Sequence, residues 1–492
     1  MSNLFYKPDK AWVGDLIPFY KDGTYRLFYL HDWRENKETY GEGTSWFELR
    51  TSDFVKYEEM GETLKHGRID EQDMNCYTGS ILEANGEYHL FYTGKNLYSP
   101  FCEDGVPLEC VMHAVSKDME TWTKLPEDTF YSDGIRYERH DWRDPFVFWN
   151  EEAGEYWMLL AARLKEGPSR RRGCIALCSS KDLKSWEIRE PFWDPKLYVT
   201  HECPDLFRIG EWWYLVYSTF SDRFVTHYRM SKSLSGPWEA PKHDAFDGRA
   251  FYAAKTWGDG EKRYAFGWVP SKENENDFSD WQWAGNLVVH EVVQQPDGTL
   301  TVRIPDTLDQ HFGTQQHFQF HSRIGEWRTA GNSAAVEADE TFACISAGAM
   351  PSTCKITANV TFTDHTRGCG VMLRASDDMD ECYYIRIEPM HNRLVFDCWP
   401  RRVKGEAQWH IAGDKPYAVE LETPIDLKAG TTYTIQILVE NSVCVVYLNH
   451  QVAMTTRLYN MKEGNWGFFV QEGRAAFEQV ELSVLNHKEV TQ

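Results

Sequence analysis

The stretch DGTYRLFYL at residues 22–30 decides the fold, because similar stretches recur along the first 270 residues of the chain. Each copy places a glycine in a turn just before a run rich in aromatic and aliphatic residues. This pattern is typical of a β-hairpin, since glycine adopts a positive φ without steric cost. The further copies are NGEYHLFYT at 85–93, AGEYWMLLA at 153–161, IGEWWYLVY at 209–217 and DGEKRYAFGW at 259–268. Internal repetition at this period predicts a repeat architecture.

A second element follows each of the first four copies. It consists of a polar turn and one aromatic residue, and reads TSDFVKY at 51–57, SKDMETW at 116–122, SKDLKSW at 180–186 and SKSLSGPW at 231–238. We expect the aromatic residue to fill the space between neighbouring sheets. Five hairpin repeats with almost no helical pattern between them predict a five-bladed β-propeller over residues 1–305, in which the first strand of each blade lines one central cavity.

The pattern changes after residue 305. Residues 306–324 are polar and rich in Gln and His, which predicts a linker. Beyond it, short strands such as CYYIRIEP (382–389) and TYTIQILVE (432–440) predict a β-sandwich over residues 325–492. The expected fold class is therefore all-β, a five-bladed β-propeller followed by a C-terminal β-sandwich.

The composition excludes several classes of partner. The chain has 52 Lys and Arg against 75 Asp and Glu, a formal charge of −23, which repels phosphate backbones and anionic lipids. We therefore expect no nucleic acid and no membrane partner, and no apolar run approaches the roughly 18 residues of a spanning helix. The start, MSNLFYKPDKAWVGD, shows no secretory signal, and the 12 cysteines are scattered without a CxxC. These features predict a cytoplasmic protein with reduced thiols, and they leave homo-oligomerisation open.

Three carboxylates lie just before repeat glycines. They are Asp15 in AWVGDLIPFY, Asp144 in DWRDPFVF and Glu202 in THECPDLF. A lone acid at a strand start is most often a turn or cap residue, so the shared position in three repeats is what carries the prediction. Cleavage of a glycosidic bond with retention needs two carboxyls about 5–5.5 Å apart, one as nucleophile and one as proton donor. The sequence therefore predicts a carbohydrate-cleaving site on the propeller axis.

These motifs resemble those of glycoside hydrolase family 32, which contains invertases, levanases and inulinases. WVGD, WRDP and ECPD around the three acids resemble the three acidic motifs of that family. Further segments with family resemblance are TSWFELRTSDFVKYEE (44–59), CYTGSI (76–81) and WAGNLVVHEV (283–292). Together with the predicted sandwich, the resemblance covers essentially the whole chain.

The resemblance implies an enzyme that cleaves terminal β-D-fructofuranosyl residues from sucrose or short fructo-oligosaccharides by double displacement, without a metal or a cofactor. Asp15 would be the nucleophile, Glu202 the general acid and base, and Asp144 the stabiliser of the transition state. Arg143 would offset the repulsion among the acids. The residues expected to bind the oligosaccharide are Trp12, Asp32, Trp33, Trp46, Tyr77, Thr78, Arg143 and Trp283.

The chain departs from the family pattern around the nucleophile. The family motif usually reads Trp–x–Asn–Asp–Pro–Asn–Gly, whereas residues 12–18 read WVGDLIP, so that Gly14 and Ile17 replace the two Asn. Leu30 stands where the family tends to place Gln. Each lost amide removes a hydrogen bond to the sugar, worth about 1 kcal/mol. We expect that other groups, such as Asp32, Trp33 or Glu48, compensate, or that the preferred glycone differs.

Several alternatives remain open at this level. A fructosyltransferase would use the same covalent intermediate, and a five-bladed relative acting on another furanoside would fit the altered first motif. A non-catalytic sugar-binding propeller is the alternative of a different class. The basic cluster SRRRG at 169–173 is either a solvated hairpin tip or a site for a phosphorylated sugar.

Overall fold

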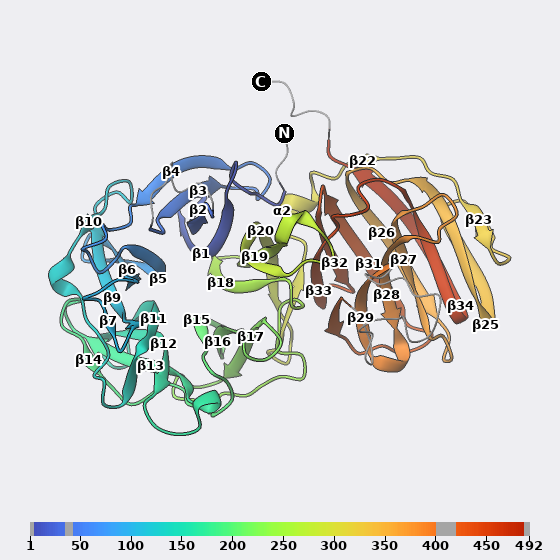
Figure 1. The fold of residues 1–492 in the computed structure, drawn as a ribbon. Helices are drawn as coiled ribbons and strands as arrows, with labels where there is room; N and C mark the ends of the chain where they lie inside the picture. Colours follow the sequence, from blue (N-terminus) through green and yellow to red (C-terminus); the bar gives the residue numbers. More distant parts are fainter. Residues whose placement is uncertain (1–3, 35–42, 400–419, 487–492) are drawn as a thin grey trace.

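The computed structural model describes residues 4–34, 43–399 and 420–486, and these are almost entirely β-structure (Figure 1). In the described residues, α-helix is limited to α2 (Asp306–Asp309). The chain forms an N-terminal group of sheets arranged around a common centre and a C-terminal sheet beside them. The expectation of an all-β chain with a separate C-terminal β-region is confirmed.

The N-terminal sheets are antiparallel and follow one another around the centre. The second sheet contains β5 (Asn75–Ala84), β6 (Glu87–Lys95), β9 (Glu109–Ser116) and β10 (Thr123–Lys124). The third contains β11 (Tyr137–Asn150), β12 (Glu155–Leu164), β13 (Gly173–Ser180) and β14 (Glu187–Ile188). The fourth contains β15 (Glu202–Ile209), β16 (Trp212–Thr219) and β17 (Val225–Ser231), and a small hairpin is formed by β7 (Cys102–Glu103) and β8 (Val106–Pro107).

The first sheet joins the two ends of this N-terminal group. One half contains β1 (Trp12–Lys21), β2 (Thr24–Asp32), β3 (Trp46–Thr51) and β4 (Glu58–Leu64). The other half contains β18 (Tyr252–Gly258), β19 (Arg263–Lys272), β20 (Trp281–Gln294) and β21 (Leu300–Arg303). The halves meet at β1 and β20 through the single residue pair Val13–Gly285. This junction brings Val13, near the start of the chain, beside Gly285, 272 positions later.

The repeat glycines adopt the conformation that the hairpin pattern predicts. Each has a positive φ, in the left-handed region, and lies in the turn between the first two strands of its unit: Gly23 (82°), Gly86 (80°), Gly154 (64°), Gly210 (58°) and Gly260 (100°). Two aromatic residues of the second repeated element pack between sheets as expected. Trp122 contacts Phe28 and Trp186 contacts Phe91, with ring centroids 6.5 Å and 5.5 Å apart.

Every innermost strand carries a β-bulge near its start. In each of β1, β5, β11, β15 and β18, the inner strand has one residue more than its partner strand between two consecutive residue pairs. In three of them the bulge contains a residue with positive φ: Asp144 (58°), Cys203 (51°) and Ala253 (51°). A bulge bends the strand and turns the local side chains out of the regular alternation. The repeated bulge therefore directs side chains from all five strands toward the same centre.

The C-terminal sheet is built around two long, bent strands, β25 (Ser333–Ala349) and β34 (Asn465–Val484). The remaining strands are β22 (Thr314–Gln315), β23 (His321–Ile324), β24 (Arg328–Ala330), β26 (Thr353–Phe362), β27 (Gly368–Ala375), β28 (Cys382–Glu388), β29 (Arg393–Trp399), β30 (Leu421–Pro424), β31 (Thr432–Glu440), β32 (Val443–Leu448) and β33 (Val452–Arg457). β22 pairs with β34 and β23 with β25. The polar stretch 306–324 therefore contains short strands of this sheet as well as connecting chain.

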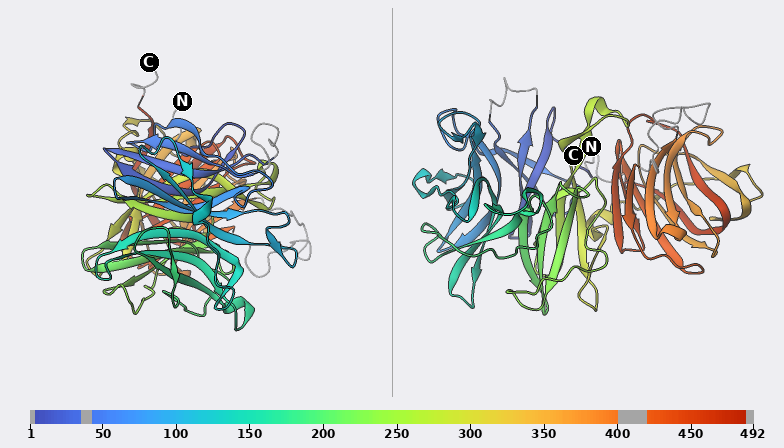
Figure 2. Two further views of the ribbon diagram at one scale, coloured as in Figure 1. Left: turned by 90° about the vertical axis from the view of Figure 1, so that its left-hand side faces the viewer. Right: turned by 60° about the horizontal axis from the view of Figure 1, so that its bottom comes forward.

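The two parts of the chain share one hydrophobic core, which contains residues of β20 and β21 together with residues of β31–β33. A buried polar network crosses the same boundary. His290 lies between the carboxylate of Asp247 (2.9 Å) and the hydroxyl of Tyr447 (2.7 Å), and Asp247 accepts hydrogen bonds from the backbone N–H and the hydroxyl of Thr455. Figure 2 shows the two parts in contact along this boundary. The C-terminal sheet is thus packed against the strands that complete the N-terminal ring.

Candidate active site

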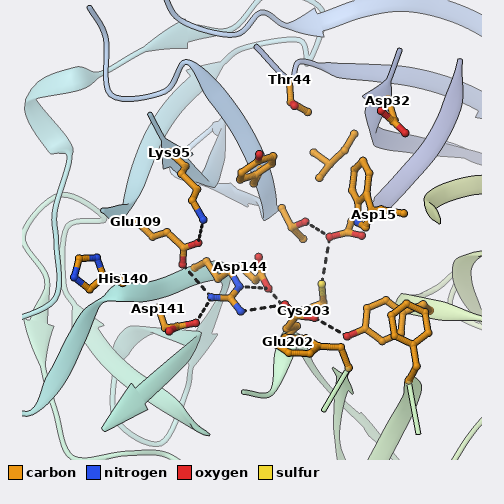
Figure 3. A pocket seen from close by; sticks show the side chains of 18 residues that line it. Asp15, Asp32, Thr44, Lys95, Glu109, His140, Asp141, Asp144, Glu202 and Cys203 are labelled. Carbon is orange, nitrogen blue, oxygen red and sulfur yellow. Dashed lines mark hydrogen bonds and ion pairs between the residues drawn. The ribbon is translucent and has the colours of Figure 1, made fainter. Parts of the chain in front are cut away.

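A cavity of about 650 Å³ lies where the inner strands begin (Figure 3). The five inner strands all contribute side chains to its wall, which explains how residues almost 240 positions apart meet there. Of the residues that the sequence analysis selected, eight line this cavity: Asp15, Asp32, Tyr77, Thr78, Arg143, Asp144, Glu202 and Trp283. The three predicted acids are therefore brought together in one cavity.

Asp15 lies in the bulge of β1 and is held by donors from three other strands. Its Oδ2 accepts a hydrogen bond of 2.5 Å from the hydroxyl of Thr78 and lies 3.6 Å from the Cys203 sulfur. Its Oδ1 accepts a hydrogen bond of 3.0 Å from the indole N–H of Trp268. These contacts fix the orientation of the carboxylate at the cavity wall.

Asp144 is buried in the bulge of β11, with 4% of its surface exposed. Its Oδ2 accepts a hydrogen bond of 2.9 Å from the backbone N–H of Cys203, and its own N–H donates to the hydroxyl of Thr93 at 2.8 Å. Cys203 therefore contacts both Asp15 and Asp144, and it directly follows Glu202 in the chain. Figure 3 shows the three carboxylates gathered around Cys203.

Glu202 is held at the start of β15 by one cation and one hydroxyl. Its Oε1 accepts a hydrogen bond of 3.0 Å from the Arg143 guanidinium, and its Oε2 accepts one of 2.5 Å from the hydroxyl of Tyr252. Arg143 also donates to Glu109 at 3.0 Å and to Asp141 at 2.6 Å. Arg143 thus links Glu202 to a second group of carboxylates on the opposite side of the cavity (Figure 3).

The electrostatics of the site follow from burial and from the crowding of carboxylates. Burial raises the pKa of Asp144 to about 7; the Arg143 guanidinium opposes this shift, while the two neighbouring acids add to it. Burial also raises the pKa of Asp15 above its ordinary value, against the hydrogen bonds from Thr78 and Trp268. Asp144 and Asp15 therefore hold their protons to a higher pH than ordinary aspartates do.

Three predicted residues lie outside the cavity wall. Trp46 is fully buried and donates its indole N–H to the carbonyl of Tyr77, so its ring has no surface to offer a sugar. Trp33 is 7% exposed and is part of the core. Trp12 stacks under the guanidinium of Arg34, 3.8 Å from the ring centroid, beside a separate small cavity. The proposed sugar-stacking role of these three tryptophans has no support in the geometry.

The sequence analysis missed several residues of the site. Tyr252 and Trp268 contact two of the acids, and Lys95, Glu109 and Asp141 form the opposite wall. Tyr252 stands at the start of the fifth inner strand, the position that the acids occupy in other repeats, so the repeat alignment could have identified it. Trp268 closes the quoted copy DGEKRYAFGW, but nothing in that pattern indicates that its indole reaches Asp15.

No group of three or more potential metal ligands among the described residues is arranged to hold a metal ion. Nor does any helix in the described ranges have the length and apolar character needed to cross a membrane. All 12 cysteines lie within the described residues, and all are free thiols.

Comparisons with known proteins show the family of this chain. Residues 5–301 match the family described as glycosyl hydrolases family 32 N-terminal domain, and residues 298–482 match the GH32, BT1760-like, C-terminal domain. The chain therefore belongs to glycosyl hydrolases family 32.

Individual relatives are more distant. The chain is 26% identical to a sucrose-6-phosphate hydrolase of Vibrio alginolyticus (57% of this chain, 58% of the relative). It is 25% identical to a raffinose invertase of Escherichia coli (60% and 63%) and 25% identical to a levanbiose-producing levanase of Bacillus subtilis (57% and 53%). The matched region thus spans less than two thirds of each of these curated relatives.

Solved structures match over nearly the whole chain. The sucrose-6-phosphate hydrolase from Lactobacillus gasseri has a TM-score of 0.70 at 18% identity, covering 98% of this chain and 92% of that one. The exo-inulinase from Aspergillus awamori has a TM-score of 0.70 at 15% identity, covering 98% and 97%. These structures share the fold of this chain.

Proposed function

We propose that the protein is a retaining glycoside hydrolase that cleaves terminal β-D-fructofuranosyl residues from sucrose or short fructo-oligosaccharides. The observation that carries this proposal is the meeting of Asp15, Asp144 and Glu202 in one cavity, with Cys203 in contact with two of them. Membership of glycosyl hydrolases family 32 supports it. The relatives of the chain include a raffinose invertase and a levanbiose-producing levanase, which supports cleavage of the same class of bond.

In the first step, a carboxylate oxygen of Asp15 attacks the anomeric carbon of the fructosyl unit. The bond to the leaving sugar breaks as Glu202 donates a proton to the glycosidic oxygen, and a fructosyl ester of Asp15 results. In the second step, Glu202 removes a proton from water, the water oxygen attacks the anomeric carbon, and Asp15 is released. Both steps pass through a cation-like transition state, which the negative charge of the acidic cluster stabilises.

The neighbours of these acids have distinct roles in this proposal. Thr78 and Trp268 orient the nucleophile Asp15. Asp144, held by the Cys203 N–H, binds sugar hydroxyls and stabilises the transition state. Arg143 and Tyr252 hold Glu202 in place, and Arg143 also reduces the repulsion within the cluster.

The architecture that we propose is a five-bladed β-propeller over residues 1–305, a connector over 306–324 and a β-sandwich over 325–492. The single pairing between β1 and β20 supports counting the first sheet as two blades, since its halves otherwise form separate four-stranded units. The free thiols are consistent with a cytoplasmic enzyme. Its partner would be a small oligosaccharide.

Covalent trapping tests the proposal directly. Incubation with an activated fluoro-fructosyl donor, followed by mass spectrometry of peptides, should place a sugar adduct on Asp15. The variants Asp15→Asn and Glu202→Gln should lower kcat on sucrose by about 10²–10⁴-fold or more while retaining the wild-type melting temperature. An adduct on another residue, or full activity in either variant, would overturn the assignment.

Product analysis, carried out beside the trapping experiment, separates the alternatives. Transfer of the fructosyl unit to a second sugar in preference to water would indicate a fructosyltransferase. Release of a different sugar from a panel of furanosides would indicate another glycone, which the replacement of both Asn by Gly14 and Ile17 favours as the second candidate. Sugar binding with neither adduct nor turnover would indicate a non-catalytic binding protein.

A further inference from the structure

Gly14, next to the nucleophile, leaves a space that the ring of Trp283 fills. A Cβ atom placed on Gly14 would lie 2.4 Å from Cη2 and 2.8 Å from Cζ2 of that indole. Both distances are shorter than any real carbon contact. The indole therefore rests directly on the backbone that carries Asp15, and only glycine at position 14 permits this.

Leu30 belongs to the same corner of the cavity. The same Cβ position at Gly14 lies 3.0 Å from the carbonyl oxygen of Leu30, and Leu30 and Trp283 both line the cavity. Positions 14 and 30 are two of the three at which the sequence lacks an amide side chain of the family pattern; the third, Ile17, is buried. The structure thus brings two of these departures together, and an aromatic ring lies against Gly14 at this corner.

Trp283 presents a free surface there and is held in place from behind. Trp283 lies two residues before Gly285, at which β20 pairs with Val13 of β1. The residue is 42% exposed. Its ring lies 6.0 Å from that of Trp268 in an edge-to-face arrangement, and Trp268 donates the hydrogen bond to Asp15. A flat, exposed ring thus lies against Gly14, the residue directly before the proposed nucleophile Asp15.

We infer that Trp283 and Gly14 form a specificity-determining pair, in which the indole stacks on the apolar face of the sugar bound at Asp15. The inference rests on the proposed function, because it assigns a wall of the same cavity. An aromatic face recognises the C–H surface of a sugar and not the direction of one hydroxyl. The glycone is therefore held at this corner by stacking instead of by hydrogen bonds from amides.

The first test compares Trp283→Ala with Trp281→Ala. Trp281 is a matched control, since it lies on the same strand, is 38% exposed and does not line the cavity. Loss of the stacking face should raise KM for sucrose and 1-kestose about tenfold or more in Trp283→Ala, with a smaller change in kcat. Trp283→Phe should recover part of the loss, and Trp281→Ala should resemble the wild type.

The second test is a double-mutant cycle. The added methyl group of Gly14→Ala displaces the indole, so this variant alone should raise KM to nearly the level of Trp283→Ala. In the Trp283→Ala background, Gly14→Ala should change KM less than about twofold, because the ring it displaces is already gone. Multiplicative effects of the two substitutions, or a Trp283→Ala variant no different from Trp281→Ala, would overturn the inference.

Calorimetric binding of free fructose and other monosaccharides separates this inference from the proposed function. If the wild type binds a monosaccharide without hydrolysing any furanoside, the proposed function fails, while weaker binding by Trp283→Ala still supports the stacking wall. If hydrolysis is observed and the Trp283 variants leave KM and monosaccharide affinity unchanged, the wall is refuted and the function stands. A wild type that binds no monosaccharide and hydrolyses no furanoside refutes both.

Discussion

Asp144 shows how the local backbone sets the chemistry of one side chain. The bulge in β11 gives it a φ of 58°, an unusual conformation for a residue with a side chain, and turns its carboxyl inward. There it accepts the N–H of Cys203, and burial raises its pKa to about 7. A carboxyl that keeps its proton near neutral pH can donate a hydrogen bond to a sugar hydroxyl as well as accept one, which suits the proposed role of Asp144 in binding the sugar.

This pKa predicts a pH-dependent loss of stability. The native Asp144 keeps its proton up to about pH 7, whereas the unfolded chain loses it near the ordinary value of 3.8. Because the native state binds more protons in this window, the free energy of unfolding falls as pH rises from about 4 to about 7. Asp144→Asn removes the ionisable group, so urea denaturation at pH 8 should show it on the order of 2 kcal/mol more stable than the wild type.

At pH 4 the gain from Asp144→Asn should fall to a small fraction of its value at pH 8, because the wild-type carboxyl is then protonated in the native state and roughly half protonated in the unfolded chain. Asp144→Ala is the control, since it also removes the acceptor of the Cys203 N–H and should show no gain at pH 8. An equal stability difference between Asp144→Asn and the wild type at both pH values would contradict the prediction.

At the scale of elements, the connection between β19 and β20 links the C-terminal sheet to the cavity wall. Asp277 in this connection is 7% exposed, and its carboxylate accepts hydrogen bonds from the hydroxyl of Tyr383 (2.5 Å) and from the backbone N–H groups of Tyr459 (2.9 Å) and Asn460 (3.0 Å). The strand that follows carries Trp283 into the cavity. The C-terminal sheet thus anchors the segment that places this ring.

The hydrogen bonds of Asp277 predict that its loss affects both the free energy of unfolding and the KM for sucrose. Asp277→Ala leaves three donors without their acceptor, which should lower the free energy of unfolding by about 2–4 kcal/mol. Because β20 then loses a fixed start, KM for sucrose should rise several-fold while kcat changes less. Asp280→Ala, in the same connection but at an exposed position, is the control for both measurements. A loss of stability with an unchanged KM would show that Asp277 has no positioning role.

At the scale of the whole molecule, the cavity carries an excess of negative charge, as the chain does. Six carboxylates line it, against the two cations Lys95 and Arg143, and both cations are already paired with Glu109. The basic cluster at 169–173 does not line the cavity, and Arg172 in it pairs with Glu138. In the described residues, the cavity therefore presents no unpaired Lys or Arg to a phosphate group.

This charge distribution predicts a preference for uncharged sugars. A phosphorylated substrate carries about two negative charges into a strongly acidic cavity, so kcat/KM for sucrose 6-phosphate should be at least about tenfold lower than for sucrose. Added NaCl should narrow the difference, because salt screens the repulsion. Steady-state kinetics on both substrates at two ionic strengths measure this. A preference for sucrose 6-phosphate at low salt would contradict the prediction and align the protein with the sucrose-6-phosphate hydrolases among its relatives.

The sequence predicted features that depend on a few neighbouring residues. A glycine before an aromatic strand forms a hairpin whatever surrounds it, so the five turns were predictable from their local pattern. Asp15, Asp144 and Glu202 were identified because each belongs to a short motif at the same place in its repeat.

The choice of the sugar-facing aromatic residues depended on the tertiary structure. Trp12, Trp46 and Trp283 all match motif segments, yet of these three only Trp283 lines the cavity, because Trp46 is packed into the core and Trp12 lies under the guanidinium of Arg34. Tyr252 and Trp268 likewise join the acids only through tertiary contacts, Tyr252 with Glu202 from 50 residues away and Trp268 with Asp15 from 253 residues away. Sequence by itself determined the strands and the acids, since turns and motifs are local. Burial and long-range neighbours are properties of the packed sheets, and only the tertiary structure decided them.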